Sequence, residues 1–215
     1  MPHQDPDMAE ELALHARGFR LVAGLDEVGR GALAGDVVAG AVILPSDAGV
    51  LQRLRGVRDS KQLTPRQRSM LRERIQAEAI AIGLGRVSAQ EIDRIGIAPA
   101  TREAMRLAVV GLDVAPDFLL IDAVHLPAVA IPQKSLIKGD VHCLCIAAAS
   151  VMAKVFRDTM MRELDEVYPG YGFALHKGYG TALHCQALRL YRPCPIHRQS
   201  YAPVRQAMLS GAEGQ

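Results

Sequence analysis

The stretch LVAGLDEVGRGALAGDVVAGAVILP, residues 21–45, contains two short apolar runs separated by a glycine-rich turn. Short apolar runs bounded by glycines are typical of neighbouring strands, which predicts strands over Arg20–Glu27 and Val37–Leu44. Asp26 and Glu27 stand where the first strand leaves its apolar run. Adjacent acids at the end of a core strand are costly unless they bind something, and the glycines after them allow the backbone to approach it closely.

Caps and periodic patterns predict the remaining elements. The segment TPRQ begins a helix with Thr64 as N-cap, Pro65 at the first helical position and Gln67 closing a capping box, and the helix runs to about Ala79. The further predicted elements are a strand AIGLGRVS, a short helix opened by the capping box SAQE at Ser88, a helix over Pro99–Val110, a strand DFLLID ending at Asp122, a short fifth strand AVAIP, and a long helix from Asp140 to just before Pro169. Strands that are first neighbours and later alternate with helices predict an α/β fold on a mixed sheet, antiparallel early and parallel later.

The composition is that of a globular protein, with 215 residues of which 49% are apolar. We expect a tail or short helix over residues 1–18, a core over 19–166 and a C-terminal extension over 167–215, all in one continuous domain. No window approaches the roughly 18 uncharged apolar residues of a membrane span. The acidic N-terminus MPHQDPDMAEE lacks a basic-then-apolar signal, so we expect a cytoplasmic protein.

Positive charge is unevenly distributed, although the formal net charge is only +2. Residues 167–212 contain no Asp or Glu, and residues 53–74 contain eight Lys or Arg against Asp59 and Glu73. Basic tracts of this kind suit a polyanion such as nucleic acid. A solvated basic surface accounts for the same pattern equally well, so charge alone leaves both interpretations open.

The four cysteines could form a zinc site only if Cys143-x-Cys145 paired with His184-Cys185. Cys143 and Cys145 are two residues apart in a predicted helix, which directs their side chains to different faces. We therefore expect no metal–thiolate site. We expect these cysteines and Cys194 to be reduced thiols, as is usual in the cytoplasm.

Carboxylates recur at the ends of the predicted elements. Asp26 and Glu27 end one strand, Asp122 ends another, and Asp140 opens the long helix. If the two strands are neighbours, these acids converge at one edge of the sheet, where their mutual repulsion requires a cation. Oxygen ligands favour Mg²⁺ or Mn²⁺, and two such ions about 4 Å apart suit phosphoryl transfer. Alternatively, each aspartate simply ends its element, as aspartate often does.

The glycines of GRGALAG do not form a nucleotide-binding loop. A phosphate-binding P-loop needs Gly-Lys-Ser/Thr leading into a helix, and a dinucleotide-binding turn needs a helix directly after its glycines. Here the glycines lead into DVVAGAVIL, a predicted strand. The sequence context therefore excludes both types of site.

Six blocks of sequence occur in the order GLDEVGRGALAGDVVAGAVIL, DSKQL, LLIDA, KGD with IAAASVMAKV, YPGYGFALHKGYGT and HRQSYAPV. Together they resemble ribonuclease HII over residues 21–204, nearly the whole chain. The resemblance implies a ribonuclease-H-like mixed five-stranded sheet flanked by helices, with a small C-terminal helical and loop extension that binds substrate. It also implies an endoribonuclease that hydrolyses the RNA strand of RNA–DNA hybrids and cuts 5′ to single ribonucleotides embedded in duplex DNA.

In that family four acids in the order Asp, Glu, Asp, Asp hold two divalent ions, and they match Asp26, Glu27, Asp122 and Asp140. The resemblance implies that these residues are catalytic and metal-binding, with Mg²⁺ or Mn²⁺ as cofactor. Hydrolysis would leave a 3′-hydroxyl and a 5′-phosphate, and its role would be to remove misincorporated ribonucleotides. We expect a monomer, because the substrate groove needs an open face. The sequence does not identify a partner in replication or repair.

The family's substrate-reading positions also have counterparts in this chain. Gly29, Arg30 and Gly31 match the turn that reads the 2′-hydroxyl at an RNA–DNA junction, a group that distinguishes RNA from DNA. Tyr179 matches the tyrosine that packs on the following deoxyribose. From the sequence alone, a tight turn accounts for the glycines and a loop anchor for the tyrosine equally well.

Five further residues are expected to contact the substrate backbone. They are Lys61, His176, Lys177, Ser150 and Lys154. The first three are candidates for phosphate contacts, with a solvated loop charge as the alternative. The last two follow Asp140 at i+10 and i+14, which predicts that they share one helix face with it.

The chain departs from the family at a few positions. Ala32 and Asp36 stand where the family usually has prolines, and Ala123 stands where it usually has glycine. None of these changes removes a catalytic carboxylate, so we expect effects on rate or metal preference only. Two alternatives are less consistent with the sequence: ribonuclease HIII has an additional N-terminal domain and usually a lysine at the position of Arg30, and a non-catalytic binder gains nothing from carboxylates that face phosphates.

Overall fold

The computed structural model describes residues 5–47 and 49–209. The chain divides into two compact units. The first contains the described residues up to Val28, Val38–Arg86 and Arg102–Val155; the second contains Gly29–Val37, Val87–Thr101 and the described residues from Phe156 onward. The expected division into 1–18, 19–166 and 167–215 stays a prediction, and residues 1–4 and 210–215 of its terminal segments lie outside the described residues.

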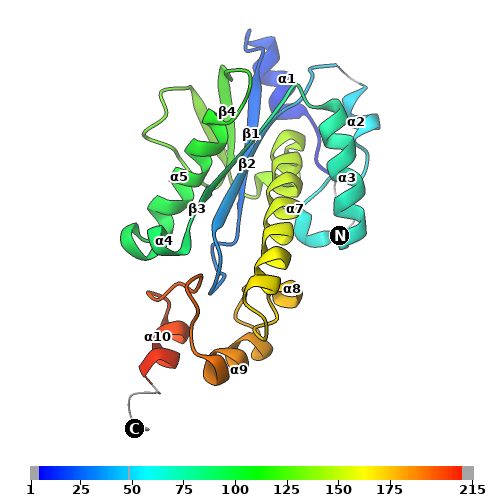
Figure 1. Cartoon of the computed structure of the whole chain (residues 1–215). Helices are drawn as coiled ribbons and strands as arrows, with labels where there is room; N and C mark the ends of the chain where they lie inside the picture. Colours follow the sequence, from blue (N-terminus) through cyan, green and yellow to red (C-terminus); the bar gives the residue numbers. More distant parts are fainter. Residues whose placement is uncertain (1–4, 48, 210–215) are drawn as a thin grey trace. The chain divides into compact units, whose positions relative to one another are not determined.

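A five-stranded sheet is the centre of the first unit (Figure 1). Its strands are β1 (Val22–Val28), β2 (Val37–Ile43), β3 (Ala81–Val87), β4 (Phe118–Asp122) and β5 (Gln133–Leu136). In the order β3-β2-β1-β4-β5, β1 is antiparallel to β2 and parallel to β4, and β4 is parallel to β5. These pairings confirm the predicted mixed sheet. The antiparallel pair comes first because a turn is enough to connect it, whereas parallel strands need longer crossover connections.

The helices of the first unit are α1 (Ala9–Ala16), α2 (Val50–Arg53), the 3₁₀ helix η1 (Ser60–Gln62), α3 (Pro65–Glu78) and α6 (Gly139–His142). Two helices contribute residues to both units, α5 (Ile97–Val110) and α7 (Leu144–Val167). The second unit contains α4 (Ala89–Ile95), α8 (Phe173–His176), α9 (Ala182–Tyr191) and α10 (Ala202–Leu209). Among the described residues, no helix combines the length and the apolar character needed to cross a membrane.

Both predicted N-caps are present, but only the one at Thr64 is a complete capping box; at Ser88 the reciprocal bond with the Glu91 side chain is not formed. The Gln67 amide donates to Thr64 Oγ1 at 3.3 Å, and the Thr64 amide donates to Gln67 Oε1 at 2.8 Å, which completes the capping box of α3. At α4 the Glu91 amide donates to Ser88 Oγ at 3.3 Å, while the Glu91 carboxylate binds Arg94 at 2.7 Å. These interactions span three residues, which is why the local sequence is sufficient to predict them.

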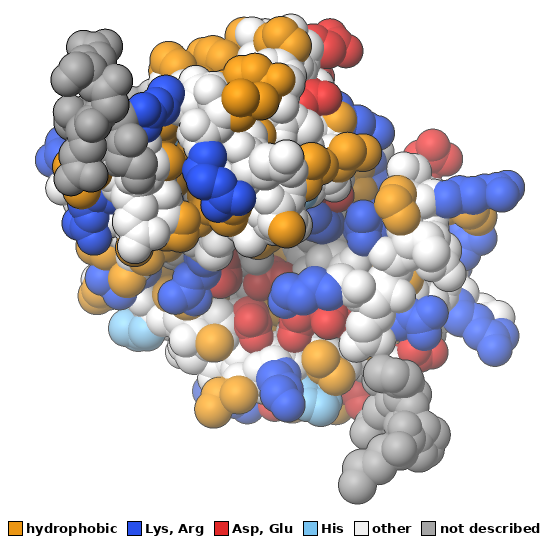
Figure 2. Space-filling view, turned by 90° about the horizontal axis from the view of Figure 1, so that it is seen from below, with side chains coloured by type: hydrophobic (Ala, Val, Ile, Leu, Met, Phe, Trp, Pro, Cys, Tyr) orange, Lys and Arg blue, Asp and Glu red, His pale blue; other side chains and the backbone are white. Residues whose placement is uncertain are grey.

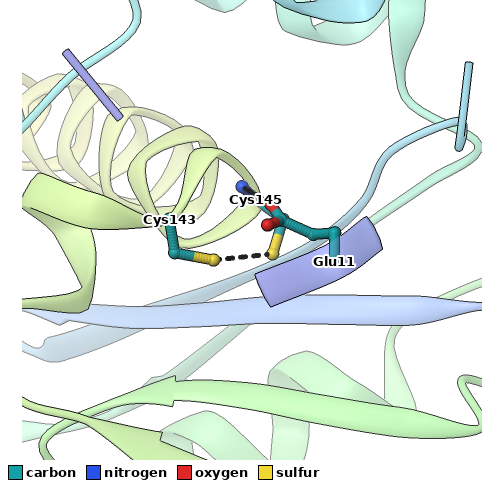
Figure 3. Close-up of side chains that lie close together, drawn as sticks. All are labelled: Glu11, Cys143 and Cys145. Atoms are coloured by element: carbon teal, nitrogen blue, oxygen red, sulfur yellow. Dashed lines mark hydrogen bonds between the residues drawn. The ribbon is translucent and has the colours of Figure 1, made fainter. Parts of the chain in front are cut away.

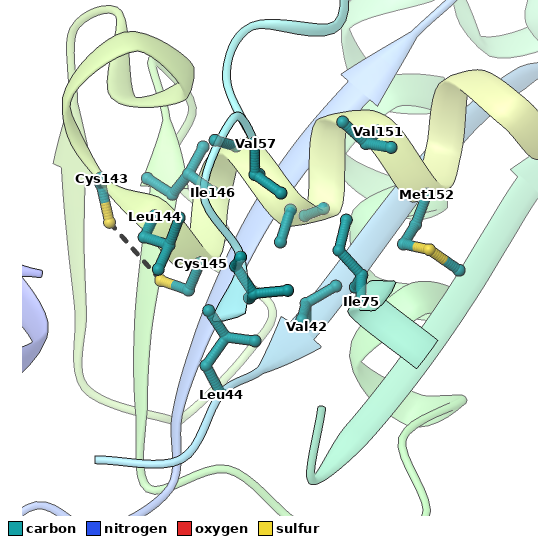
Figure 4. Close-up of a cluster of buried hydrophobic side chains, with 14 of the residues drawn as sticks. Val42, Leu44, Val57, Ile75, Cys143, Leu144, Cys145, Ile146, Val151 and Met152 are labelled. Carbon is teal, nitrogen blue, oxygen red and sulfur yellow. Dashed lines mark hydrogen bonds between the residues drawn. The ribbon is translucent and has the colours of Figure 1, made fainter. Parts of the chain in front are cut away.

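Two helices pack closely on opposite faces of the sheet (Figure 1). On one face, Gly24 of β1 and Gly40 of β2 leave space for the backbone of α7. Side chains along a strand alternate between faces, and Gly83 and Gly85 of β3 leave space for α5 on the other face. The first face carries the core drawn in Figure 4, which combines buried side chains of β2, α3 and α7.

The fifth strand lies further along the chain than the sequence predicts. The run AVAIP (128–132) forms a loop, and β5 begins at Gln133. The Gln133 side chain explains the difference, because its Oε1 accepts the Leu126 amide at 2.8 Å and its Nε2 donates to the carbonyls of Leu126 and Val129 at 3.0 and 3.2 Å. These bonds hold the apolar run in a loop, so the polar segment QKSL pairs with β4 instead.

The predicted long helix is interrupted at Cys143, whose backbone is extended (φ −117°, ψ 123°). A distant segment explains the break, because the backbone of Asp7 hydrogen-bonds on both sides of Cys143, at 3.1 and 2.9 Å. Asp140 therefore lies in α6, whereas Ser150 and Lys154 lie in α7. The prediction of one continuous helix face that carries all three residues is wrong.

The same break overturns the expected placement of two thiols. Cys143 and Cys145 were expected on different faces of one helix, but their Sγ atoms lie 3.4 Å apart because Cys143 leaves the helix in an extended conformation. Both side chains are buried, as is that of Glu11. The argument from helix geometry against a metal–thiolate site is therefore wrong.

Candidate active site

Three of the four predicted acids form one group at the ends of neighbouring parallel strands. Asp26 and Glu27 lie near the end of β1 and Asp122 ends β4, and one carboxylate oxygen of each lies within 4.8 Å of the others. The register of these strands, in which Leu25 pairs with Ile121, brings their ends together. Parallel pairing thus converts acids that are far apart in the sequence into one group.

Asp140 is the fourth acid, and the first turn of α6 holds it beside the group. The Gly139 amide donates to Asp122 Oδ1 at 2.7 Å, which attaches the start of α6 to the end of β4. Only 6% of the Asp140 surface is exposed, and its charge contributes to raising the pKa of Asp26. The first unit therefore brings together all four predicted carboxylates.

These carboxylates are held at an electrostatic cost. Burial raises the pKa of Asp26 well above its ordinary value, and the neighbouring carboxylates raise it further, while a hydrogen bond from Ser150 lowers it. Burial is also the largest cause of the raised pKa of Asp122 and of Asp140. Lys61 Nζ lies 3.7 Å from Asp140 Oδ2, and its ammonium offsets part of the negative charge.

A hard divalent cation fits this group. Its donors are carboxylate oxygens, the ligands that Mg²⁺ and Mn²⁺ prefer. Like charges buried together destabilise a fold unless a cation offsets them. Figure 2 shows Asp and Glu side chains gathered on one face. The four residues are therefore suited to hold such ions.

Divalent cations should raise the thermal stability of the protein. A raised carboxylate pKa means that the folded state favours the protonated acid, so its contribution to stability is full below the ordinary pKa of about 4 and is lost as pH rises through the raised value. In chelator, the destabilisation by these acids should therefore shrink as pH falls from about 8 toward 5, measured as a smaller stability difference between Asp26→Asn and the wild type. The total Tm does not isolate this effect, because the buried neutral His184 and His197 lose stability as pH falls below about 6.5. At about pH 8, Mn²⁺ at about 100 times its Kd should add about 2.7 kcal/mol, or roughly 5–10 °C in Tm.

Asp26→Asn is the test variant for this prediction, because it removes one buried charge. Without metal at about pH 8 it should raise the free energy of unfolding, and it should diminish the Mn²⁺ increment. Asp113→Asn, at an exposed acid, is the matched control and should change neither quantity. A metal-free Asp26→Asn protein less stable than the wild type would contradict this account of the site.

Of the other first-unit residues predicted to contact substrate, Ser150 and Lys61 lie near the acids. Ser150 Oγ and Ser60 Oγ hydrogen-bond at 2.9 Å, and both side chains are buried. Since Ser150 also bonds Asp26, it supports the acid group. Lys61 is exposed in η1, and Lys154 is half-buried one turn after Ser150 in α7. Their substrate contacts stay predictions.

In the second unit, the structure gives different reasons for glycine at positions 29 and 31 of the predicted recognition turn. Gly29 adopts φ +93°, a left-handed conformation that favours glycine, and a Cβ there would overlap the guanidinium of Arg157. Gly31 lies outside the left-handed region, and a Cβ built on it meets no atom of the described residues within 4 Å. The fold thus accounts for glycine at position 29, whereas at position 31 the missing side chain leaves room beside the backbone.

Two buried arginines that the sequence pattern does not reveal hold this turn. Arg157 of α7 donates to the carbonyls of Ala34, Asp36 and Lys177 at 2.9–3.0 Å, and burial lowers its pKa to about 10, so it remains charged at neutral pH. Arg198 donates to two further carbonyls of the same segment, those of Gly35 and Arg30. The sequence signal, an arginine close to apolar residues, is too common to be diagnostic.

The loop that carries Tyr179 is paired with the segment after the glycine turn. Ala32 and Tyr179 form an antiparallel bridge, and the Leu33 amide donates to the Gly178 carbonyl at 2.8 Å. The Arg157 guanidinium lies 5.5 Å from the centre of the Tyr179 ring, a cation–π contact. The second unit therefore brings together two predicted recognition elements that are far apart in the sequence.

A chain of hydrogen bonds connects Cys194 to the backbone of Tyr179. His184 Nδ1 lies 3.0 Å from the Tyr179 carbonyl, so Nδ1 carries the proton and Nε2 accepts. His197 Nε2, 3.0 Å away, donates to His184 Nε2, and His197 Nδ1 accepts the Cys194 amide at 2.9 Å. Burial lowers the pKa of both histidines to about 4, which agrees with two neutral rings. Sequence reasoning missed this support of the Tyr179 loop, because it becomes visible only when the two histidines meet.

His176 and Lys177 lie beside the Tyr179 loop, and their polar atoms are engaged within the second unit. The Gly178 amide donates to His176 Nδ1 at 3.1 Å, and His176 Nε2 donates to the Tyr171 carbonyl at 2.8 Å. The Lys177 ammonium donates to the Ala174 carbonyl. Their predicted phosphate contacts stay a prediction and would require some of these bonds to be exchanged.

The departures from the family pattern have distinct surroundings. Ala123 directly follows Asp122 and adopts φ +48°, a left-handed conformation that costs a non-glycine residue about 1–2 kcal/mol. Glycine would adopt this conformation without that cost, which explains why the family usually has glycine at this position. Ala32 pairs with Tyr179, and Asp36 supplies a backbone carbonyl to Arg157. The effect of the three residues on rate stays a prediction.

Comparisons with known proteins agree with this arrangement. A sequence model of the family described as Ribonuclease HII matches residues 23–204. A curated protein named Ribonuclease HII from Chlamydia abortus is 53% identical over 198 residues, which cover 92% of this chain and 91% of that protein. The crystal structure of the ribonuclease H2 from Pyrococcus horikoshii is 27% identical with a TM-score of 0.74, over 88% of this chain and 97% of that one. The structure of the PCNA:RNase HII complex from Archaeoglobus fulgidus is 25% identical with a TM-score of 0.72, over 87% of this chain and 96% of that one.

Proposed function

The chain belongs to the ribonuclease HII family of metal-dependent nucleases, and from this membership we propose that it hydrolyses the RNA strand of RNA–DNA hybrids and cuts duplex DNA 5′ to embedded ribonucleotides. The observation that carries the proposal is the group of Asp26, Glu27 and Asp122, joined by Asp140. The products are a 3′-hydroxyl and a 5′-phosphate. In this proposal the protein acts as a cytoplasmic monomer on nucleic acid that contains ribonucleotides.

The four carboxylates would hold two divalent ions, Mg²⁺ or Mn²⁺. Such ions, when bound, supply an activated water for attack on phosphorus and offset charge on the leaving oxygen. The chain's own residues position these ligands: the Gly139 amide orients Asp122 and Ser150 orients Asp26. Lys61 places an exposed ammonium near Asp140, where it favours the approach of a phosphate.

The second unit would recognise the ribonucleotide. The space beside the backbone at Gly31 admits the edge of a sugar, whose 2′-hydroxyl can both donate and accept hydrogen bonds. The Tyr179 ring would pack on the next deoxyribose, where an additional 2′-hydroxyl would interfere with the packing. The hydrogen bond from His184 to the Tyr179 carbonyl, and the hydrogen bond from Arg157 to the Lys177 carbonyl, limit how far the Tyr179 loop can move. Together these groups would select a junction from RNA to DNA.

Cleavage of a DNA duplex that carries one ribonucleotide tests the proposal. With Mg²⁺ or Mn²⁺ we expect a single cut on the 5′ side of the ribonucleotide, and chelator should abolish it. Cutting only within longer RNA stretches would be consistent with the proposed metal site but would overturn the proposed recognition of the RNA–DNA junction. Tight binding without cleavage of either substrate would indicate a non-catalytic binder.

Tyr179→Ala should separate junction recognition from hydrolysis. Loss of ring packing should slow the cut at a single ribonucleotide by about 10-fold, equivalent to about 1.4 kcal/mol, with a smaller effect on long RNA–DNA hybrids. Tyr168→Ala, at a half-buried tyrosine near the end of α7, is the control and should cut both substrates at wild-type rates. Equal loss on both substrates in Tyr179→Ala would argue against a junction-specific role.

A further inference from the structure

A second cluster of ligand-type side chains lies in the first unit (Figure 3). It consists of Glu11 of α1, Cys143 between α6 and α7, and Cys145 in the first turn of α7. One oxygen of Glu11 and the two Sγ atoms lie within 4.8 Å of one another, and the thiols are 3.4 Å apart. The exposed fraction is 2% for Glu11 and 0% for each cysteine, so the cluster belongs to the interior.

Glu11 is only partly satisfied in this position. Its Oε1 accepts the Cys145 amide at 2.9 Å, a contact that caps α7, whereas its Oε2 is buried and has no hydrogen-bond partner among the described residues. The surroundings are the apolar core that includes Met8, Leu14 and Leu144. A buried carboxylate oxygen without a donor is costly, and burial accordingly raises the pKa of Glu11. A cation at this place would offset the charge.

We propose that Glu11, Cys143 and Cys145 bind a thiophilic divalent cation, with Zn²⁺ as the biological ion. Cysteine thiolates and carboxylates are zinc ligands, and two sulfurs on one tetrahedral zinc, at about 2.3 Å each, lie about 3.8 Å apart. The observed thiol spacing of 3.4 Å needs only a small change to match. Binding replaces the two thiol protons, which leave for solvent, and a water completes the fourth position. No oxidant or reductant is involved.

This ligand set differs in chemical preference from the four carboxylates. Those carboxylates offer oxygen alone and suit hard ions, whereas two thiolates favour softer ions over Mg²⁺. A disulfide between Cys143 and Cys145 is the rival chemistry, but it would leave the Glu11 carboxylate unmatched, whereas a cation employs all three side chains. Bound to α1, to Cys143 at the break and to Cys145 in the first turn of α7, the ion would stabilise the junction that follows Asp140.

Cd²⁺ titration of the full chain tests the proposal. The protein is kept reduced with a phosphine, and excess Mg²⁺ occupies the carboxylates. We expect one equivalent of Cd²⁺ to produce the near-ultraviolet absorption of cadmium thiolates, to release two protons, and at saturation to raise Tm by about 5–10 °C. A protein that shows no thiolate absorption under these conditions overturns the proposal.

Three variants assign the signal to the cluster. Cys143→Ser with Cys145→Ser should abolish the absorption, and Cys185→Ser, at a half-buried thiol of the second unit, should retain it. Absorption that persists in the double variant assigns the ion to other thiols and overturns the proposal. Should the double variant fail to fold, Glu11→Gln keeps both thiols and should weaken Cd²⁺ binding by about 10-fold or more. An unchanged affinity in Glu11→Gln overturns the three-ligand site.

Discussion

Asp140→Asn is expected to slow cleavage of an RNA–DNA hybrid by about 10³-fold or more. A neutral amide removes one of the charges that hold the divalent ions. Each 1.36 kcal/mol of lost transition-state stabilisation slows the reaction tenfold, so a 10³-fold loss corresponds to about 4 kcal/mol. The surrounding fold should survive, because the Gly139 amide still binds Asp122. The measurement is a single-turnover cleavage rate in saturating Mn²⁺, together with hybrid binding by fluorescence anisotropy.

Binding distinguishes loss of catalysis from loss of the site. Hybrid affinity should stay within about threefold of the wild type, since basic residues rather than this acid supply the contacts to phosphates. Asp113→Asn, at an exposed acid of the same unit, should cleave at the wild-type rate. If Asp140→Asn kept more than a tenth of the activity, the fourth carboxylate would have no essential part in metal binding.

Arg157→Ala is expected to lower the free energy of unfolding by about 3–5 kcal/mol. The guanidinium is fully buried and donates to the carbonyls of Ala34, Asp36 and Lys177, each of which would lose a donor in the interior of the second unit. A loss of this size is a large share of the 5–15 kcal/mol that stabilises a typical protein. Denaturant-induced unfolding, followed by circular dichroism, measures it.

The Arg157 prediction has two internal comparisons. Arg157→Lys keeps the charge but cannot span three carbonyls as a planar guanidinium does, so it should fall between the wild type and alanine. Arg162→Ala, at an exposed arginine of the same helix, should change stability by less than about 0.5 kcal/mol. If Arg157→Ala were as stable as Arg162→Ala, the three carbonyl contacts would not be what holds the glycine turn.

Elements whose signals lie within a few residues could be predicted from the sequence. The capping box of Thr64 and Gln67 closes over three residues, so its bonds need no information from the rest of the chain. The paired strands before and after the glycine turn are likewise set by adjacent apolar runs. The acids at strand ends could also be named, because each one directly follows an apolar run in the sequence. That they meet at one edge follows from the parallel pairing of their strands.

Predictions failed where a distant side chain or backbone decides the local conformation. The run AVAIP has the composition of a strand, but Gln133 uses its amide to hold the run in a loop. The pattern from residue 140 onward suits one helix, but the backbone of Asp7 interrupts it at Cys143. A sequence pattern depends only on residues close together in the chain. The effects of the Gln133 side chain and of the Asp7 backbone therefore could not be predicted from the segments whose conformation they change.

The sequence by itself determined the family, the α/β class, the order of the main elements, and which acids stand at strand ends. Only the tertiary structure decided that Asp140 belongs to a separate short helix attached to Asp122, that Arg157 lies buried under the glycine turn, and that Glu11 meets Cys143 and Cys145. The physical reason is the range of the interactions. Caps and strand patterns depend on residues a few positions apart, whereas burial, pKa and ligand geometry depend on groups that meet only when the whole chain has packed.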